Sequence, residues 1–254
     1  MTGFSPDFSG AVVRPSPNFG ERRGGRRPDA LILHYTGMSS GAAAEEWLCN
    51  PVSEVSSHYL VHEDGRIVQM VPEAARAWHA GSGSWQGESD VNSFSIGIEI
   101  VNPGHQYGYR DFPQVQVEGV IALCRDICRR HAVLPQRVLA HSDTAPGRKV
   151  DPGEKFPWKV LADNGVGHYV APEPIAEGEA LAVGNRGEAV AALQRRLAAY
   201  GYGVEITGIY DARTETVVAA FQRHFRPARI DGAADSSTRQ TLETLIASLP
   251  QTRV

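Results

Sequence analysis

The sequence predicts a mixed α/β fold, with a central mixed β-sheet flanked by helices, followed by a small all-α domain of three helices. Short apolar strands alternate with helical patterns over the first two-thirds of the chain, and only helical patterns continue after a stretch rich in proline and glutamate. Strands separated by helices indicate a sheet with helices packed on its faces. We therefore expect an α/β domain over residues 1–168, a linker over 169–180 and a three-helix domain over 181–254.

The first predicted elements are a strand, a short helix and a hairpin. RPDALILHYTG predicts a strand, with Leu31 and Leu33 on one face and His34 on the other. GAAAEEWLCN predicts a short helix that ends before Pro51, because proline cannot continue a helix. SSHYLVHEDGRIVQMV predicts two extended segments joined by a tight turn, which together form a hairpin.

Two further strands and a longer helix complete the first domain. In NSFSIGIEIVN, isoleucines alternate with small or polar residues, among them Glu99, which is typical of a strand. Residues 117–131 have the spacing of an amphipathic helix whose apolar face includes Cys124 and Cys128. We interpret these thiols as small core residues, with a metal or redox role as the alternative. RVLAH then predicts a short strand that ends at His141.

The last 70 or so residues predict three helices, each with one apolar face. The second and third helical patterns begin with an aspartate followed three residues later by a threonine. Aspartate and serine are favoured N-cap residues, so we expect Asp211 to cap the second helix and Asp235 or Ser236 the third. A segment of this size can just support a core of its own.

Composition and charge exclude several classes of function. The chain has 254 residues and a formal net charge of −4, which disfavours nucleic acid as a partner. No apolar run approaches the ~20 residues that a membrane-spanning helix needs. Three cysteines imply no complete disulfide framework. The first 25 residues do not resemble a signal peptide and hold no cysteine for a lipid anchor. We expect a cytoplasmic monomer, or a periplasmic or outer-membrane-associated protein if an export signal is missing.

Two histidines and one aspartate form a candidate metal site. His34 and His141 each stand at the end of a predicted strand, where loops that carry functional sites begin. Asp151 follows ten residues after His141, in the proline- and glycine-rich loop of LAHSDTAPGRKVDPG. Two imidazoles and one carboxylate are a known ligand set for catalytic zinc. The alternative is a core histidine with an acid that stabilises the loop.

Glu99 and Lys149 are candidate catalytic residues. Glu99 points away from the isoleucines of its strand, and a carboxylate there is costly unless it is paired or functional. It is either a structural acid bound to an arginine or a general base that takes a proton from water. Lys149 either stabilises negative charge on a substrate oxygen or forms a surface ion pair with Asp143 or Asp151.

Five blocks of the sequence together resemble a known family. LILHYT, SSHYLVHEDGRIVQMVPE, ARAWHAGSGSW, NSFSIGIEIVNPG and LAHSDTAPGRKVDPGEKFPW occur in this order over residues 30–158. The set is similar to the zinc-dependent N-acetylmuramoyl-L-alanine amidases (amidase type 2), which are related to the peptidoglycan recognition proteins. The C-terminal pattern, from LAVGNRGEAVAALQRRLAAYGY onward, resembles the three-helix peptidoglycan-binding domain. The combination is most like the two-domain AmiD type of amidase.

The resemblance implies a role for each candidate residue. His34, His141 and Asp151 match the family's zinc ligands, for one zinc ion per chain. Glu99 matches its catalytic acid/base, and Lys149 matches the residue that stabilises the tetrahedral intermediate.

Four more positions lie within or near the matched motifs. Trp78 and His79 match a segment near the substrate cleft. His58 falls in a well-marked motif, where we expect a structural or supporting role. Arg148 is placed to meet a substrate carboxylate, with a solvated loop arginine as the alternative.

The implied function is hydrolysis of the amide bond between the lactyl group of N-acetylmuramic acid and L-alanine. The substrate would be peptidoglycan or a muropeptide, with or without an anhydro end, in cell-wall turnover or recycling. The alternative is a protein that binds peptidoglycan without cleaving it. The presence of the full ligand set together with Glu99 and Lys149 favours the enzyme.

Overall fold

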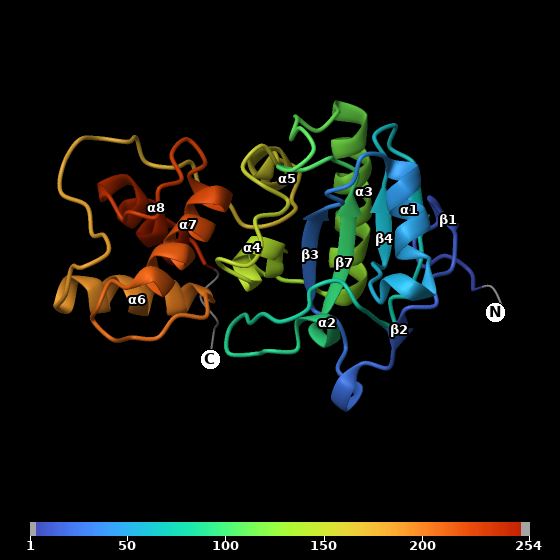
Figure 1. Ribbon diagram of the computed structural model, residues 1–254, viewed down its shortest axis with the longest axis horizontal. Coiled ribbons are helices and arrows are strands. Elements are labelled where there is room, and N and C mark those ends of the chain that lie inside the picture. The colour runs from blue at the N-terminus through green and yellow to red at the C-terminus, as the bar shows by residue number, and fades with distance from the viewer. Residues whose placement is uncertain (1–3, 250–254) are drawn as a thin grey trace.

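The computed structural model describes residues 4–249 and is built around one six-stranded sheet (Figure 1). Its strand order is β1-β5-β4-β7-β3-β8, and all pairs are parallel except β4 with β5. A separate antiparallel pair joins β2 to β6. The strands are β1 (Ala11–Val13), β2 (Phe19–Gly20), β3 (Ala30–Tyr35), β4 (Tyr59–Val61), β5 (Ile67–Gln69), β6 (Arg76–Ala77), β7 (Ser95–Ile100) and β8 (Val138–Ala140).

Eight α-helices accompany the strands in the part of the chain that the structure describes. Five precede residue 169 and three follow it. They are α1 (Gly41–Leu48), α2 (Val91–Phe94), α3 (Gln114–His131), α4 (His141–Thr144), α5 (Trp158–Asp163), α6 (Glu188–Tyr200), α7 (Ala212–Phe225) and α8 (Ser236–Ala247). Short 3-10 turns lie at Arg23–Gly25, Pro51–Ser53 and Pro135–Arg137.

The predicted fold class is confirmed, and most predicted elements are present. The hairpin of β4 and β5 turns at Gly65, and the long helix α3 begins three residues earlier than predicted. Asp211 and Asp235 cap α7 and α8 by accepting hydrogen bonds from the backbone amides three residues on. The sequence did not predict β1, β2, β6, α2, α4 or α5, which are too short to show a clear period. Residues 92–94 were expected to belong to the following strand, but they lie in α2.

The two faces of the sheet are covered differently. Helix α3 covers one face, where its apolar residues pack against the isoleucines of β7 and where Cys124 is buried. On the other face, Leu48 at the end of α1 packs over β4 and β5. The ends of β3 and β7 on this second face are left for the site described below.

The three C-terminal helices share a core with the second face of the sheet. Ile32 of β3 and Leu139 of β8 belong to the same buried cluster as apolar residues of α6, α7 and α8. Figure 1 shows α4 and α5 between the sheet and these helices. Trp85 is fully buried in this cluster, with its indole ring 5.0 Å from the ring of Tyr202 and against Gly201. The helices are therefore docked on the sheet.

The predicted linker lies along the surface of the helical segment. Residues 169–180 contain no helix or strand, in agreement with their composition. They are nevertheless held to α8, because the Glu173 amide donates to Thr241 Oγ1 (3.0 Å) and Ser237 Oγ donates to the Glu173 carbonyl (2.6 Å). The boundaries 1–168, 169–180 and 181–254 remain a prediction. Among the described residues, none of the helices has the length and apolarity required to span a bilayer.

Trp85 lies in the core that the sheet shares with the C-terminal helices, so replacing it should destabilise the whole fold. We expect Trp85→Ala to lower the free energy of unfolding by about 3–5 kcal/mol, because it empties a large space in a core shared by the sheet and the helices. Trp47→Ala is the matched control, since Trp47 is 44% exposed and should cost far less. Denaturant unfolding measures both variants. Equal losses in the two variants, or separate unfolding of sheet and helices in the parent chain, would contradict a shared core.

Candidate active site

Neighbouring parallel strands bring three polar side chains to one edge of the sheet. The register pairs His34, near the end of β3, with Glu99, near the end of β7. On the other side of β3, strand β8 ends one residue before His141. The carboxyl ends of parallel strands form the usual ligand-binding edge of an open α/β sheet. The parallel register therefore assembles the core of the site.

The loop after α4 returns Asp151 to the same edge. The Ser142 amide in α4 donates to the Asp151 carbonyl (3.1 Å), so the two ends of the loop are tied together. Gly147 and Gly153 have φ angles of 75° and 87°. Other residues adopt these angles with strain, whereas glycine does not. The loop thus has a defined shape, which places Asp151 against both histidines.

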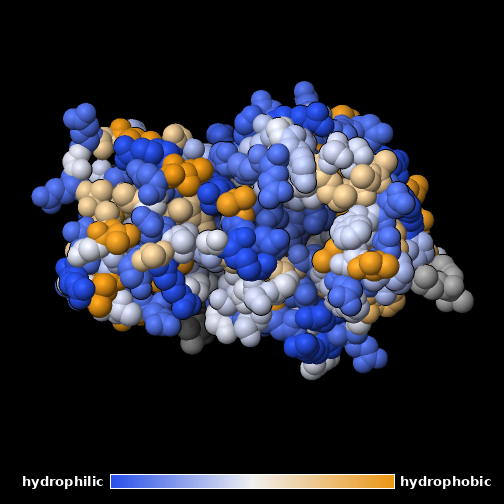
Figure 2. Space-filling view, in the orientation of Figure 1, coloured by the Kyte–Doolittle hydropathy of each residue, from blue (hydrophilic) through white to orange (hydrophobic). Residues whose placement is uncertain are grey.

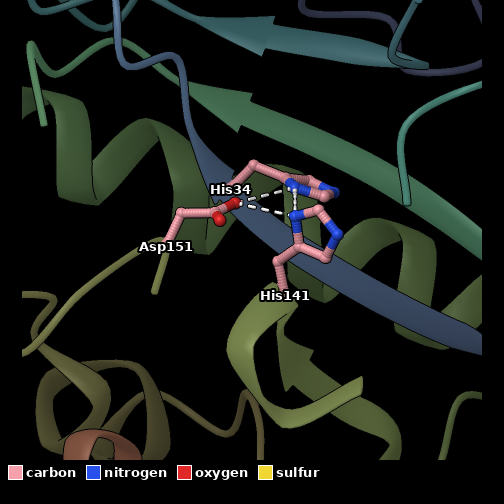
Figure 3. Close-up of side chains that lie close together, drawn as sticks. All are labelled: His34, His141 and Asp151. Atoms are coloured by element: carbon pink, nitrogen blue, oxygen red, sulfur yellow. Dashed lines mark hydrogen bonds and ion pairs between the residues drawn. The ribbon is translucent and has the colours of Figure 1, made fainter. Parts of the chain in front are cut away.

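His34, His141 and Asp151 point their polar atoms at one another (Figure 3). The two Nδ1 atoms lie 2.9 Å apart, and each lies 3.0 Å from Asp151 Oδ2. All three residues are buried. Within residues 4–249, this is the one group of three or more His, Cys, Asp or Glu residues whose ligand atoms converge in this way.

A chain of hydrogen bonds sets the tautomer of His34. Ser95 Oγ donates to the Val91 carbonyl (2.6 Å), so it accepts from His79 Nε2 (3.3 Å). His79 Nδ1 then carries no proton and accepts from His34 Nε2 (3.0 Å). The proton of the neutral His34 ring is thereby placed on Nε2. Its Nδ1 lone pair is left facing His141 and Asp151.

A backbone carbonyl orients His141. Its Nε2 lies 2.9 Å from the Ala80 carbonyl, which can only accept, so Nε2 carries a proton and Nδ1 is the ring nitrogen that faces His34 and Asp151. Burial and the adjacent His141 lower the pKa of His34 to about 4, so its ring is neutral at pH 7. Burial acts to raise the pKa of Asp151, but the two adjacent imidazoles outweigh it and lower that pKa, so the carboxylate is ionised. Two imidazole nitrogens and one carboxylate oxygen therefore meet, as in a metal site.

Glu99 lies beside this group on the wall of the cleft. Its Oε2 is out of contact with solvent and has no hydrogen-bond partner among the described residues. Burial raises the pKa of Glu99 well above its usual value, and the negative charge of Asp151 raises it further. Lys149 acts in the opposite direction. A carboxyl group whose pKa is raised in this way can both accept and return a proton during a reaction.

Lys149 is available to a ligand in the cleft. Its ammonium group is close enough to affect the pKa values of both Glu99 and His34. Within the described residues, no ion pair with Asp143 or Asp151 engages it. The alternative of a surface ion pair is therefore wrong for the structure as described.

A cleft of about 520 Å³ opens above these residues. Trp78, His79, Arg148 and Lys149 line it, as do residues that the sequence analysis did not single out, namely Tyr35, Trp47 and His105. Figure 2 shows a surface on which hydrophilic residues predominate and hydrophobic residues are scattered in small groups. Trp47 was not expected in the cleft, because the pattern of its segment predicted a helix and nothing more.

Arg148 and His58 have mainly structural contacts. Arg148 Nη2 donates to the Ala80 carbonyl (2.7 Å) and to the Ser82 carbonyl. It therefore holds the segment that also positions His141, although it borders the cleft. His58 is buried, and its Nδ1 accepts from the Gly97 amide (2.9 Å). His58 is therefore hydrogen-bonded to β7 and is not one of the three converging side chains.

Family models match both parts of the chain. The model described as N-acetylmuramoyl-L-alanine amidase matches residues 24–154, which include every candidate site residue. A peptidoglycan binding domain model matches residues 186–242, which span α6 and α7 and half of α8.

Curated relatives and solved structures agree with these matches. N-acetylmuramoyl-L-alanine amidase AmiD of Escherichia coli is 36% identical over 240 residues, or 89% of this chain and 84% of that protein. A structure of E. coli AmiD with the substrate anhydro-N-acetylmuramic acid-L-Ala-D-gamma-Glu-L-Lys superposes with a TM-score of 0.74 at 33% identity, covering 91% of this chain and 97% of the other. AmpDh3 of Pseudomonas aeruginosa has a TM-score of 0.71 at 30% identity, covering 96% and 98%.

A shorter relative matches part of the chain. The 1,6-anhydro-N-acetylmuramyl-L-alanine amidase AmpD of E. coli is 32% identical over 166 residues, which is 59% of this chain and 88% of that protein. The curated relatives that match part of the chain and those that match most of it are all amidases. The alternative of a protein that binds peptidoglycan without cleaving it is therefore rejected. The chain belongs to the N-acetylmuramoyl-L-alanine amidase family and is an amidase of that class.

Proposed function

We propose that this amidase holds one zinc ion with His34, His141 and Asp151 and uses Glu99 and Lys149 for hydrolysis. The observation that carries the proposal is the convergence of three potential ligand atoms, the Nδ1 atoms of His34 and His141 and Oδ2 of Asp151, at 2.9–3.0 Å from one another. Imidazole nitrogens and a carboxylate oxygen at these distances repel one another unless they share a cation. Neutral imidazoles and an ionised carboxylate are the forms in which these side chains bind metal.

The donor set suits zinc in particular. Two nitrogens and one oxygen match the His and carboxylate ligands of catalytic zinc sites, in which three protein residues hold the metal. A zinc ion held there would polarise a substrate carbonyl and lower the pKa of water toward about 7. His79 and Ala80 support the site from outside by fixing the orientation of the two imidazoles.

Glu99 would move the protons of the reaction. It accepts a proton from the attacking water as the carbonyl carbon becomes tetrahedral, and then gives that proton to the departing amine of L-alanine. Its raised pKa suits both halves of this transfer, because a strongly acidic carboxyl group would hold the proton too weakly to deliver it. Lys149 would stabilise the negative charge that develops on the carbonyl oxygen.

The substrate we propose is a muropeptide with an N-acetylmuramic acid end. The cleft presents aromatic rings (Trp47, Trp78) next to polar and basic groups, which suits a sugar joined to an acidic peptide. Two related structures support anhydro-muropeptides, because AmiD is in complex with anhydro-N-acetylmuramic acid-L-Ala-D-gamma-Glu-L-Lys and AmpDh3 with an anhydromuramic pentapeptide. The scissile bond would join the lactyl group to L-alanine.

Loss of one proposed ligand should remove the metal. We expect His34→Ala to bind zinc at least about 100-fold more weakly than the parent, since loss of outer partners alone costs 10- to 100-fold. Hydrolysis of an anhydro-muropeptide should fall below detection. His168→Ala is the control, because this half-buried imidazole binds Tyr200 and Ser248 away from the cleft. The zinc content of both variants is measured after dialysis. If His34→Ala retains as much zinc as the parent, His34 is not a ligand and the proposed site is wrong.

Glu99→Gln should separate metal binding from catalysis. The amide has the size of the carboxyl group but cannot take up the proton, so kcat should fall about 10²- to 10⁴-fold while zinc stays near one per chain. Glu154→Gln serves as the control, because Glu154 is a partly exposed carboxylate paired with His105 at the rim. Steady-state kinetics and metal analysis of the same samples are the measurement. A Glu99→Gln enzyme with near-parental kcat would exclude the acid/base role.

Lys149→Met should lower kcat more than it raises KM. We expect a loss of about 10²- to 10³-fold in kcat, as when one donor to a developing oxyanion is removed. Lys155→Met is the control, since the Lys155 ammonium lies near Asp111 at the surface (3.3 Å). Equal kinetics for the two lysine variants would show that Lys149 does not act on the transition state.

A further inference from the structure

Asp143 is a buried carboxylate that the proposed reaction does not use. Its side chain is fully buried, and three donors converge on it. The Ala140 amide donates to Oδ2 (2.8 Å), Tyr202 Oη donates to Oδ1 (2.7 Å) and His224 Nδ1 lies 2.7 Å from Oδ2. Burial of a carboxylate is unfavourable unless such donors replace water, so the position of Asp143 depends on all three.

Asp143 fixes the backbone that carries His141. Helix α4 contains only four residues, too few to be stable alone, so tertiary contacts hold it in place. The bond from the Ala140 amide to Asp143 closes the start of α4, at the residue just before His141. A displacement of the Asp143 carboxylate would therefore move the His141 backbone, and with it the Nδ1 atom that faces His34 and Asp151.

Both side-chain donors to Asp143 come from the C-terminal helical segment. Tyr202 follows α6 and His224 lies in α7, and both are buried. The His224 ring stacks on Trp158 of α5, with 3.7 Å between ring centroids. Figure 1 shows α4 in the space between the sheet and these helices, and α4 contacts α7. The segment that matches a peptidoglycan binding domain thus contacts α4, the short helix that carries His141.

We propose that Tyr202 and His224 are positioning residues for hydrolysis, which hold His141 in place through Asp143. The C-terminal segment is then a structural part of the active site, in addition to any contact that it makes with glycan. This inference rests on the proposed function, because the position of His141 matters for the reaction only if His141 binds the metal.

The test uses full-length chains that lack one donor each. Tyr202→Phe and His224→Phe keep the aromatic ring and remove the hydrogen bond. Tyr200→Phe is the matched control, because Tyr200 is another buried tyrosine of the same segment, and its hydroxyl bonds to His168 instead. For each variant we would measure zinc affinity by competition with a chelator, kcat, KM and thermal unfolding.

We expect Tyr202→Phe and His224→Phe to bind zinc on the order of 10-fold more weakly than the parent, as for loss of other supporting partners of metal ligands. Their kcat should fall while KM changes little. Tyr200→Phe should lose a similar amount of thermal stability and keep parental zinc affinity. His224→Asn should bind zinc more tightly than His224→Phe, since it restores an N–H donor while losing the ring that stacks on Trp158.

Three results would overturn the inference in different ways. If Tyr202→Phe and His224→Phe bind zinc and turn over substrate as Tyr200→Phe does, the positioning role is wrong and the proposed function stands. If the parent chain itself binds no zinc, the proposed function fails, and the positioning role fails with it. If His224→Phe binds zinc more tightly than His224→Asn, the change in zinc affinity comes from the packing of the ring. That result would refute a role for the hydrogen bond between His224 and Asp143.

Discussion

The parallel pairing of β3 with β7 and β8 is the constraint on which the active site depends. It places His34 beside Glu99 and brings the start of α4, with His141, to the same edge of the sheet. Strand β7 carries isoleucines toward α3 and Glu99 toward the cleft, so one strand serves both the core and the chemistry. A shift of one residue in this register would exchange the two faces.

Around this sheet, two layers of contacts hold the converging side chains. The nearer layer consists of His79 and the Ala80 carbonyl, which orient the two imidazoles from outside. The farther layer includes the helical segment, whose residues share a core with β3 and β8 and bond to Asp143 of α4. The C-terminal helices are therefore packed into the structure around the site and are not a mobile unit joined to it by a linker.

Much of this could be predicted from the sequence, because strand alternation, helix caps and the loop around Asp151 have local signatures. Trp85 could not be placed, since nothing in its neighbours shows that it packs against Gly201, more than 100 residues away. The bonds from Tyr202 and His224 to Asp143 were missed for the same reason, and Asp143 was considered only as a partner of Lys149. Domain boundaries, cellular location and oligomeric state stay predictions.

The measurement that tests the central claim most directly is X-ray absorption at the zinc edge of the purified, full-length protein. We predict a four-coordinate ion with only nitrogen and oxygen neighbours at about 2.0–2.2 Å, and with the scattering pattern of two imidazoles. A sulfur neighbour at about 2.3 Å would mean that cysteine binds the metal. That result, or a spectrum without imidazole scattering, would contradict a zinc site made by His34, His141 and Asp151.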